Sequence, residues 1–243
     1  MKFPIIQAIT EAFPLSSSLH LKLSGCAEIT LMHLFTGLAG AIFVLFNLRQ
    51  ARKYIAPALK ACKELKITHL FLNSFILLAL LYSKQHISPG IANEIGLFCC
   101  ITSAIFMYIV DSAAESRGGF SLTGKQINLC LIANLAAVLP GVSRLGTVYT
   151  CLRITGLNRE DSVRFSTIQG IIINFMGVFT HMSDLVYIIN KPALAFAAAL
   201  YYVCLLYLFA ANDRQLRYII AGSAVYRILV LPVIFYLFAG FSR

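Results

Sequence analysis

Two segments of this chain place charged and polar residues inside long apolar stretches. The first segment carries Glu11, Ser17 and His20 on either side of Pro14. Because Gln7 and Glu11 are four residues apart, they share one face of a helix until the proline disrupts it. Carboxylate, hydroxyl and imidazole groups can transfer protons, attack phosphorus or hold a cation. An acid beside such groups in apolar surroundings indicates a functional site.

Three serines follow the proline: Ser16, Ser17 and Ser18. They can cap a second half-helix, whose free backbone amides attract an anion. His20 lies three residues after Ser17, on the same side of that half-helix. We therefore expect the acid, the hydroxyl and the imidazole to converge where the helix is interrupted.

The second segment reads Pro-Gly-Val-Ser-Arg-Leu-Gly over residues 140–146. Gly141 and Gly146 let the backbone curl so that successive amides point into one concavity, an anion nest. Arg144 supplies a planar, permanently charged fork that suits phosphate oxygens. An acid, an arginine and a nest that face each other predict a phosphate-ester site, with a divalent cation bridging Glu11 and the phosphate.

The composition places these segments in a membrane protein. Of the 243 residues, 59% are hydrophobic and 12% charged, against about 25% charged in an ordinary soluble domain. The mean hydropathy is +0.80. The net charge of +10 does not indicate nucleic-acid binding, because the basic residues lie mainly between long apolar runs, as membrane topology requires. The sequence predicts a polytopic, all-helical membrane protein.

Six stretches are long and apolar enough to span a bilayer, which takes roughly 20 residues. They are residues 29–48, 67–83, 91–111, 163–183, 193–211 and 218–238. The two polar segments interrupt the apolar stretches 3–25 and 125–155. Irregular backbone survives at membrane depth only where protein or a wet cavity satisfies it, so we expect two re-entrant helix–loop–helix hairpins.

The order of these elements predicts an inverted repeat within a single domain, residues 1–243. Each half, about 3–111 and 125–238, is one hairpin followed by three spans, and an odd number of spans inverts the second half. Residues 49–66 hold six basic residues and one acid, which places that loop, and a short amphipathic helix within it, on the cytoplasmic side. The first hairpin then opens outward, and the hairpin tips meet near the midplane.

Other polar residues in the spans are expected to support this site. Arg227 is predicted to pair with a carbonyl or an acid. Five polar residues are interpreted as interhelical hydrogen-bonding groups: His33, Asn73, Asn134, Asn174 and His181. Three arginines near the inner boundary are interpreted as topology determinants: Arg153, Arg159 and Arg164.

Both interrupted segments resemble the two signatures of the bacterial undecaprenyl-diphosphate phosphatase family, the bacitracin-resistance type. The matching residues are Thr10-Glu11, Pro14, Ser16-Ser17-Ser18 and His20 in the first signature, and Pro140-Gly141, Ser143-Arg144 and Gly146 in the second. Weaker similarity continues through Gly156, Arg159, Arg164-Phe165-Ser166 and Tyr226-Arg227. The chain departs from the signatures at several positions: Gln7 replaces a glutamate, Leu19 a glycine and Leu145 a serine, and Thr147-Val148 stands where Ala-Thr is usual.

The resemblance implies a role for each matching residue. Glu11, Ser17, His20 and Arg144 would be catalytic. Phosphate-binding positions would be Ser16, Ser18, Gly141, Ser143 and Gly146. The implied reaction converts undecaprenyl diphosphate to undecaprenyl phosphate and inorganic phosphate, which recycles the lipid carrier of cell-wall synthesis in the bacterial inner membrane. The implied cofactor is Mg²⁺ or Ca²⁺ near Glu11, with Gln7 removing one anionic ligand.

The sequence leaves several alternatives open. Ser17 is the expected nucleophile for an in-line attack, with His20 transferring protons and Arg144 stabilising charge, but direct attack by water fits almost as well. A transporter or flippase that binds a polyprenyl phosphate or another anion without cleaving it is the alternative function. A structural membrane subunit is the third reading. The partners expected are the polyprenyl lipid and membrane lipids, and a homodimer is left open.

Overall fold

The computed structural model describes residues 2–15, 19–20, 29–63, 89–115, 120–137, 139, 141–180 and 192–239. Within these ranges every regular element is helical. The elements are α1 (Lys2–Ala12), α3 (Ile29–Phe46), α4 (Leu48–Cys62), α6 (Pro89–Ala113), α7 (Gly124–Ala136), α8 (Arg144–Ile154), α9 (Arg159–Thr180), α11 (Pro192–Ala210), α12 (Asp213–Val225), the π-helical turn η2 (Tyr226–Val230) and α13 (Leu231–Ala239).

The predicted all-helical class is confirmed for the described residues. In the part of the chain that the structure describes, three stretches are long and apolar enough to cross a membrane: Glu94–Ala113, Pro192–Ala210 and Asp213–Tyr236. Helices α3, α6, α9, α11 and the α12–η2–α13 unit fall on five of the six predicted spans. The sixth, 67–83, lies outside the described residues, as does most of the second arm of the first hairpin. The inverted repeat stays a prediction.

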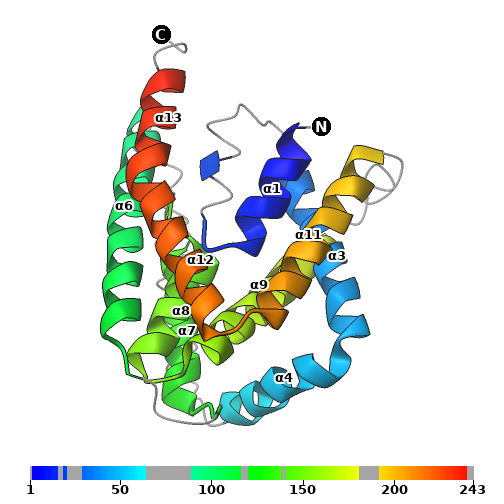
Figure 1. Cartoon of the computed structure of the whole chain (residues 1–243). Coiled ribbons are helices and arrows are strands. Elements are labelled where there is room, and N and C mark those ends of the chain that lie inside the picture. The colour runs from blue at the N-terminus through cyan, green and yellow to red at the C-terminus, as the bar shows by residue number, and fades with distance from the viewer. Residues whose placement is uncertain are drawn as a thin grey trace.

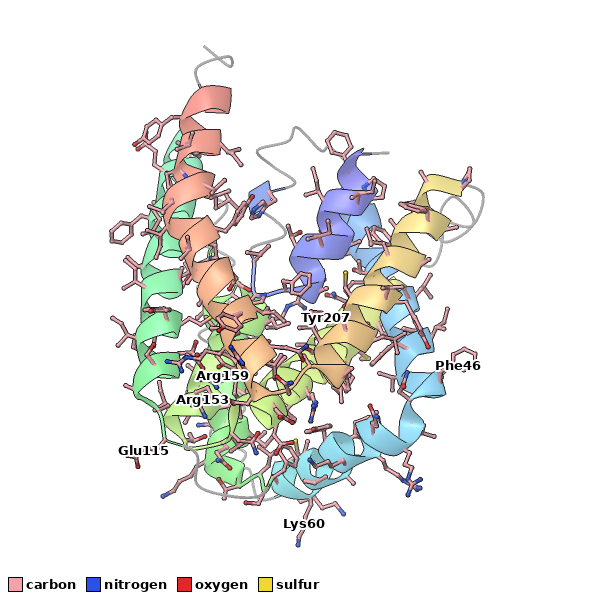
Figure 2. All side chains as sticks on the ribbon, viewed as in Figure 1. Phe46, Lys60, Glu115, Arg153, Arg159 and Tyr207 are labelled. Carbon is pink, nitrogen blue, oxygen red and sulfur yellow. The ribbon has the colours of Figure 1, made fainter. Side chains whose placement is uncertain are left out.

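The helices form two groups joined by the central helices of the chain. Figure 1 shows α6 and the α12–α13 unit on one side, α1, α3 and α11 on the other, and α4 across one end. Figure 2 shows Phe46 pointing away from α3 and Lys60 projecting from the outer face of α4. An apolar flank with a basic end is the arrangement expected of a membrane protein.

Local sequence explains where several helices begin. Thr123 caps α7 and Asn212 caps α12, each in a capping box with the glutamine three residues later. Helix α3 packs closely on α9 because Gly37 has no side chain: a Cβ there would lie 2.7 Å from the carbonyl oxygen of Asn174. This contact brings the polar residues of α3 and α9 to the same region as the end of α1.

Helix α4 docks on the first turn of α9 through one carboxylate. Asp161 accepts hydrogen bonds from Lys53 Nζ (2.9 Å), Tyr54 Oη (2.8 Å) and Asn158 Nδ2 (2.7 Å). Burial opposes the charge of Asp161, but these donors outweigh it and lower the pKa of Asp161 below its usual range. The same contact raises the pKa of Lys53.

Candidate functional site

Helix α1 carries the only acid of the first interrupted segment, and the helix ends just after it. Glu11 is on the last turn of α1, before the bend at Phe13–Leu15. Gln7 lies one turn earlier on the same face, as predicted, and its Nε2 donates to Glu11 Oε2 at 3.0 Å. The same Nε2 lies 2.9 Å from Nδ1 of His33 on α3. The position of the acid is therefore fixed from within α1 and from α3.

The second interrupted segment brings its arginine to this acid. Helices α7 and α8 pack against each other on either side of the break, and Ser143 caps α8 by accepting from the Gly146 amide at 3.2 Å. Arg144 is thus the first residue of α8, and its Nη2 lies 3.4 Å from Glu11 Oε1. Asn174 on α9 donates to the same oxygen at 2.7 Å.

A small cavity of about 60 Å³ lies where the two segments meet. Glu11, Ser143 and Arg144 line it, together with Thr167 of α9 and Tyr201 of α11. The predicted proximity of Glu11 and Arg144 is confirmed. The cavity is the size of a small polar group.

His20 has a different neighbour from the one expected. Its Nε2 lies 3.0 Å from the hydroxyl of Tyr226, and the two rings are stacked at 5.5 Å. Among the described residues, the cavity lining includes Glu11 and Arg144 but not His20. The three serines 16–18, with the expected nucleophile Ser17, lie outside the described residues, as does Pro140. Their roles stay predictions.

The two glycines of the second signature have packing roles in the structure. Gly141 adopts φ +82°, and a Cβ there would lie 1.8 Å from the carbonyl oxygen of Gly96 on α6. Gly146 is buried against Met107 of α6, and its amide already donates to Ser143. Neither glycine is among the residues that line the described cavity, and both let the bend and the start of α8 approach α6. Their role in binding an anion stays a prediction.

Arg227 pairs with carbonyls, one of the two kinds of partner that the sequence predicts for it. Its guanidinium donates to the carbonyl of Cys100 (2.8 Å), the sulfur of Cys100 (3.2 Å), the hydroxyl of Ser103, and the carbonyls of Pro14 (3.4 Å) and Gly141 (3.5 Å). Pro14 and Gly141 belong to the bends of the two interrupted segments. One buried arginine therefore contacts both of them and α6.

Sequence reasoning missed two partners of the acid. His33 and Asn174 were interpreted as interhelical hydrogen-bonding groups, and both do bridge helices, but the group they meet is Glu11. His33 Nδ1 lies 3.5 Å from Glu11 Oε2. A polar residue in an apolar span was the available signal, but nothing in the spacing linked residues 33 and 174 to residue 11.

A second polar cluster lies apart from the cavity, where α6, α8, α9 and α12 meet (Figure 2). Asp111 accepts from Arg159 Nε at 2.9 Å and from the hydroxyl of Tyr149, and lies 3.6 Å from Arg153 Nε. Arg159 also pairs with Asp213 at 2.6 Å. The interpretation of Arg153 and Arg159 as topology determinants is therefore incomplete, because both are buried and hold helices together.

The donor set around Glu11 does not fit a divalent cation held by two carboxylates. Both oxygens of Glu11 accept from protein donors, including the guanidinium of Arg144 and the amide of Gln7. Within the described residues, no group of three or more His, Cys, Asp or Glu could hold a metal ion. Mg²⁺ and Ca²⁺ favour several anionic oxygens, so the cation implied by the resemblance stays a prediction without support from these contacts.

These features define a helical membrane protein in which two interrupted segments bring an acid and an arginine to one polar cavity. The chain belongs to the bacitracin resistance protein BacA family, whose sequence model matches residues 2–230. It is 26% identical over 257 aligned positions to an undecaprenyl-diphosphatase of Gemmatimonas aurantiaca, covering 95% of this chain and 94% of the relative. It is 30% identical over 177 positions to the undecaprenyl-diphosphatase of Thermosipho melanesiensis, covering 69% and 70%. A relative with the same name in Nitrosococcus oceani is 26% identical over 260 positions, covering 97% and 96%.

Proposed function

We propose that this chain hydrolyses undecaprenyl diphosphate to undecaprenyl phosphate and inorganic phosphate. Membership of the BacA family and the names of its relatives support this reaction. The observation that carries the proposal is the contact of Glu11 and Arg144 across one cavity, because these residues come from the two signature segments, 133 positions apart. By this reaction the protein recycles the lipid carrier of cell-wall synthesis and contributes to bacitracin resistance.

Arg144 binds the terminal phosphate in this proposal. Only one of its three guanidinium nitrogens contacts a described residue, Glu11, and that contact is long at 3.4 Å. Its side chain is 25% exposed toward the cavity. The remaining donors can therefore bind phosphate oxygens in the bidentate geometry that suits a guanidinium. In the transition state they stabilise the charge on the equatorial oxygens.

The attack on phosphorus uses the first segment. Glu11 is held by Gln7 and Asn174, so it can orient a hydroxyl or a water molecule without moving. Ser17 is the proposed nucleophile, and the in-line displacement breaks the bond from the terminal phosphorus to the bridging oxygen, which leaves as part of undecaprenyl phosphate. Water then hydrolyses the phosphoseryl bond and releases inorganic phosphate. His20 transfers the proton to or from the reacting oxygens. In the alternative route a water molecule attacks directly, and trapping of a phosphoseryl intermediate distinguishes the two routes.

The proposed membrane arrangement has six spans and two re-entrant hairpins in inverted halves, in the bacterial inner membrane, with the site open to the outer face. The α7–α8 pair on either side of its break supports a hairpin, and the basic outer face of α4 supports its position at the cytoplasmic surface. Accessibility of single cysteines at Lys60 and at the cavity residue Leu15 tests the orientation. Labelling of both positions from the same side of the membrane would contradict it.

An apolar groove of about 570 Å³ between α3 and α11 suits the polyprenyl chain. Leu38 of α3 and Ala198 and Tyr202 of α11 line it. The residue before Tyr202 is Tyr201, which lines the polar cavity. Adjacent faces of α11 thus meet a polar cavity and an apolar groove, and an amphiphilic diphosphate needs one of each.

The test is release of inorganic phosphate from undecaprenyl diphosphate by the purified protein. Arg144→Ala is expected to lower kcat by about 10²–10³, as loss of a donor to developing negative charge does. Arg217→Ala is the matched control, because Arg217 is exposed on α12. If vesicles containing the wild-type protein move the lipid across the membrane with no release of phosphate, the transporter reading replaces this proposal.

A further inference from the structure

The last long helix of the chain is interrupted by a π-helical turn, η2, between α12 and α13. Such turns are rare, and they occur often at functional sites because the extra residue re-aims the side chains around it. The turn begins with Tyr226 and Arg227, which contact the two interrupted segments that form the cavity. These contacts give the turn a role in the reaction.

Arg227 is 1% exposed, and its partners among the described residues are carbonyls, a hydroxyl and a sulfur, with no carboxylate. The position of a guanidinium buried in this way is fixed, because each of its donors must meet an acceptor that does not move. Two of the acceptors are the carbonyls of Pro14 and Gly141. Leu15 and Val142, which directly follow them, line the cavity. Arg227 therefore lies behind the cavity and holds both of its bends.

Tyr226 contacts the residue for which a proton-transfer role is proposed. Its ring lies against that of His20 at 5.5 Å with an interplanar angle of 15°, which fixes the plane of the imidazole. Its hydroxyl lies 3.0 Å from Nε2 of His20, which fixes the rotation of the ring within that plane. An imidazole held by a hydrogen bond at one nitrogen and by a stacked ring has a defined orientation.

We propose that Tyr226 and Arg227 are positioning residues for the phosphatase reaction. Tyr226 sets the orientation of His20, and Arg227 keeps the two bends in register on α6. This inference rests on the proposed function, which supplies the reaction that His20 and the bends serve. Neither residue lines the described cavity, so each acts through a neighbour.

Tyr226→Phe tests the first half, because it keeps the stacked ring and removes only the hydroxyl. We expect kcat to fall about tenfold, the effect of one hydrogen bond to a catalytic group, with KM and the thermal midpoint unchanged. The decisive measurement repeats the substitution in a His20→Ala background, with enzyme in excess over radiolabelled lipid. If Tyr226 acts through His20, the second loss disappears. An equal loss in both backgrounds, or no loss in the wild type, overturns the inference.

A second readout does not depend on turnover. In protein labelled with ¹⁵N-histidine, the ring signals of His20, assigned by comparison with His20→Ala, should shift in Tyr226→Phe. They should not shift in Tyr218→Phe, since Tyr218 is exposed on α12. If the wild-type protein releases no phosphate, the proposed function fails, yet these spectra still decide whether Tyr226 holds His20. Unchanged His20 signals in Tyr226→Phe refute the contact itself.

Arg227→Lys tests the second half, because lysine keeps the charge but cannot reach both carbonyls with one fork. We expect kcat to fall at least about tenfold, and spin labels placed at Leu15 and Val142 to show a broader distance distribution. Arg217→Lys, on the exposed face of α12, should change neither property. A narrow, unchanged distribution together with full activity in Arg227→Lys would show that Arg227 does not hold the bends.

Discussion

Gln7→Glu is the substitution that examines the acid of this site most directly. The new carboxylate would stand where the Gln7 amide now donates to Glu11 Oε2 at 3.0 Å. Two negative charges at that distance repel by about 5 kcal/mol at an effective dielectric constant of about 20. Arg144 can offset one of these two charges, so the second charge favours an additional bound cation.

We therefore expect Gln7→Glu to depend on divalent cations more strongly than the wild-type protein does. Phosphate release by the wild type should change by less than about threefold when EDTA is added. Release by Gln7→Glu should fall by at least about tenfold in EDTA and recover with Mg²⁺ or Ca²⁺. Binding of Mn²⁺ to the lipid-free protein, followed by electron paramagnetic resonance, measures the new site independently of turnover.

Gln50→Glu is the matched control, because Gln50 is exposed on α4 and the same change there adds a charge far from any acid of the cavity. It should bind no Mn²⁺ and respond to EDTA as the wild type does. The reasoning is refuted if the wild type already loses its activity in EDTA and binds Mn²⁺ as tightly as Gln7→Glu does. In that case the contacts of Glu11 with Gln7 and Arg144 do not replace a cation.

Three further substitutions test other parts of the structure. Gly141→Ala should lower the thermal midpoint by at least about 3 °C and abolish turnover, because its positive φ and its contact with Gly96 leave no room for a methyl group; Gly222→Ala, which meets open space, is the control. Because the pKa of Asp161 is lowered in the folded protein, its ionised carboxylate stabilises the fold at pH values above the unfolded pKa of about 3.9. This stabilisation is lost as the pH falls through the folded pKa. Asp161→Asn should therefore be less stable at pH 7 and should lose less stability on acidification, as unfolding in detergent can measure. Ala198→Phe should fill the groove between α3 and α11 and lower kcat/KM for the C55 diphosphate by about tenfold, while a short-chain diphosphate is cleaved as before.

The predictions that held were those that local sequence determines. The lengths of the apolar stretches predicted the positions of the helices, and Pro14 predicted the end of α1. The four-residue spacing placed Gln7 against Glu11. The contact between Glu11 and Arg144 is longer-range, but it followed from two interrupted segments in a chain where irregular backbone needs a polar partner. All but this last contact depend on local backbone geometry alone.

The parts that were missed depend on how distant helices rotate against one another. Asp111 was not singled out, although it meets Arg159 and Tyr149 across three helices. His33 and Asn174 reach Glu11 because Gly37 allows α3 to approach α9 closely. The packing angle of two helices depends on side chains along their whole interface. No short motif encodes it, so these contacts could not be found from spacing.

The two arginines at membrane depth show why residue type alone does not assign a role. Arg144 keeps two guanidinium nitrogens free of described partners and is 25% exposed in the cavity, so its charge remains available to a ligand. Arg227 is 1% exposed, and its guanidinium donates hydrogen bonds to acceptors in the two bends. A guanidinium bound on every side holds its surroundings rigid but cannot bind an incoming phosphate as well. In the proposed reaction, Arg144 therefore stabilises the charge that develops on the substrate, and Arg227 keeps the cavity around it in one shape.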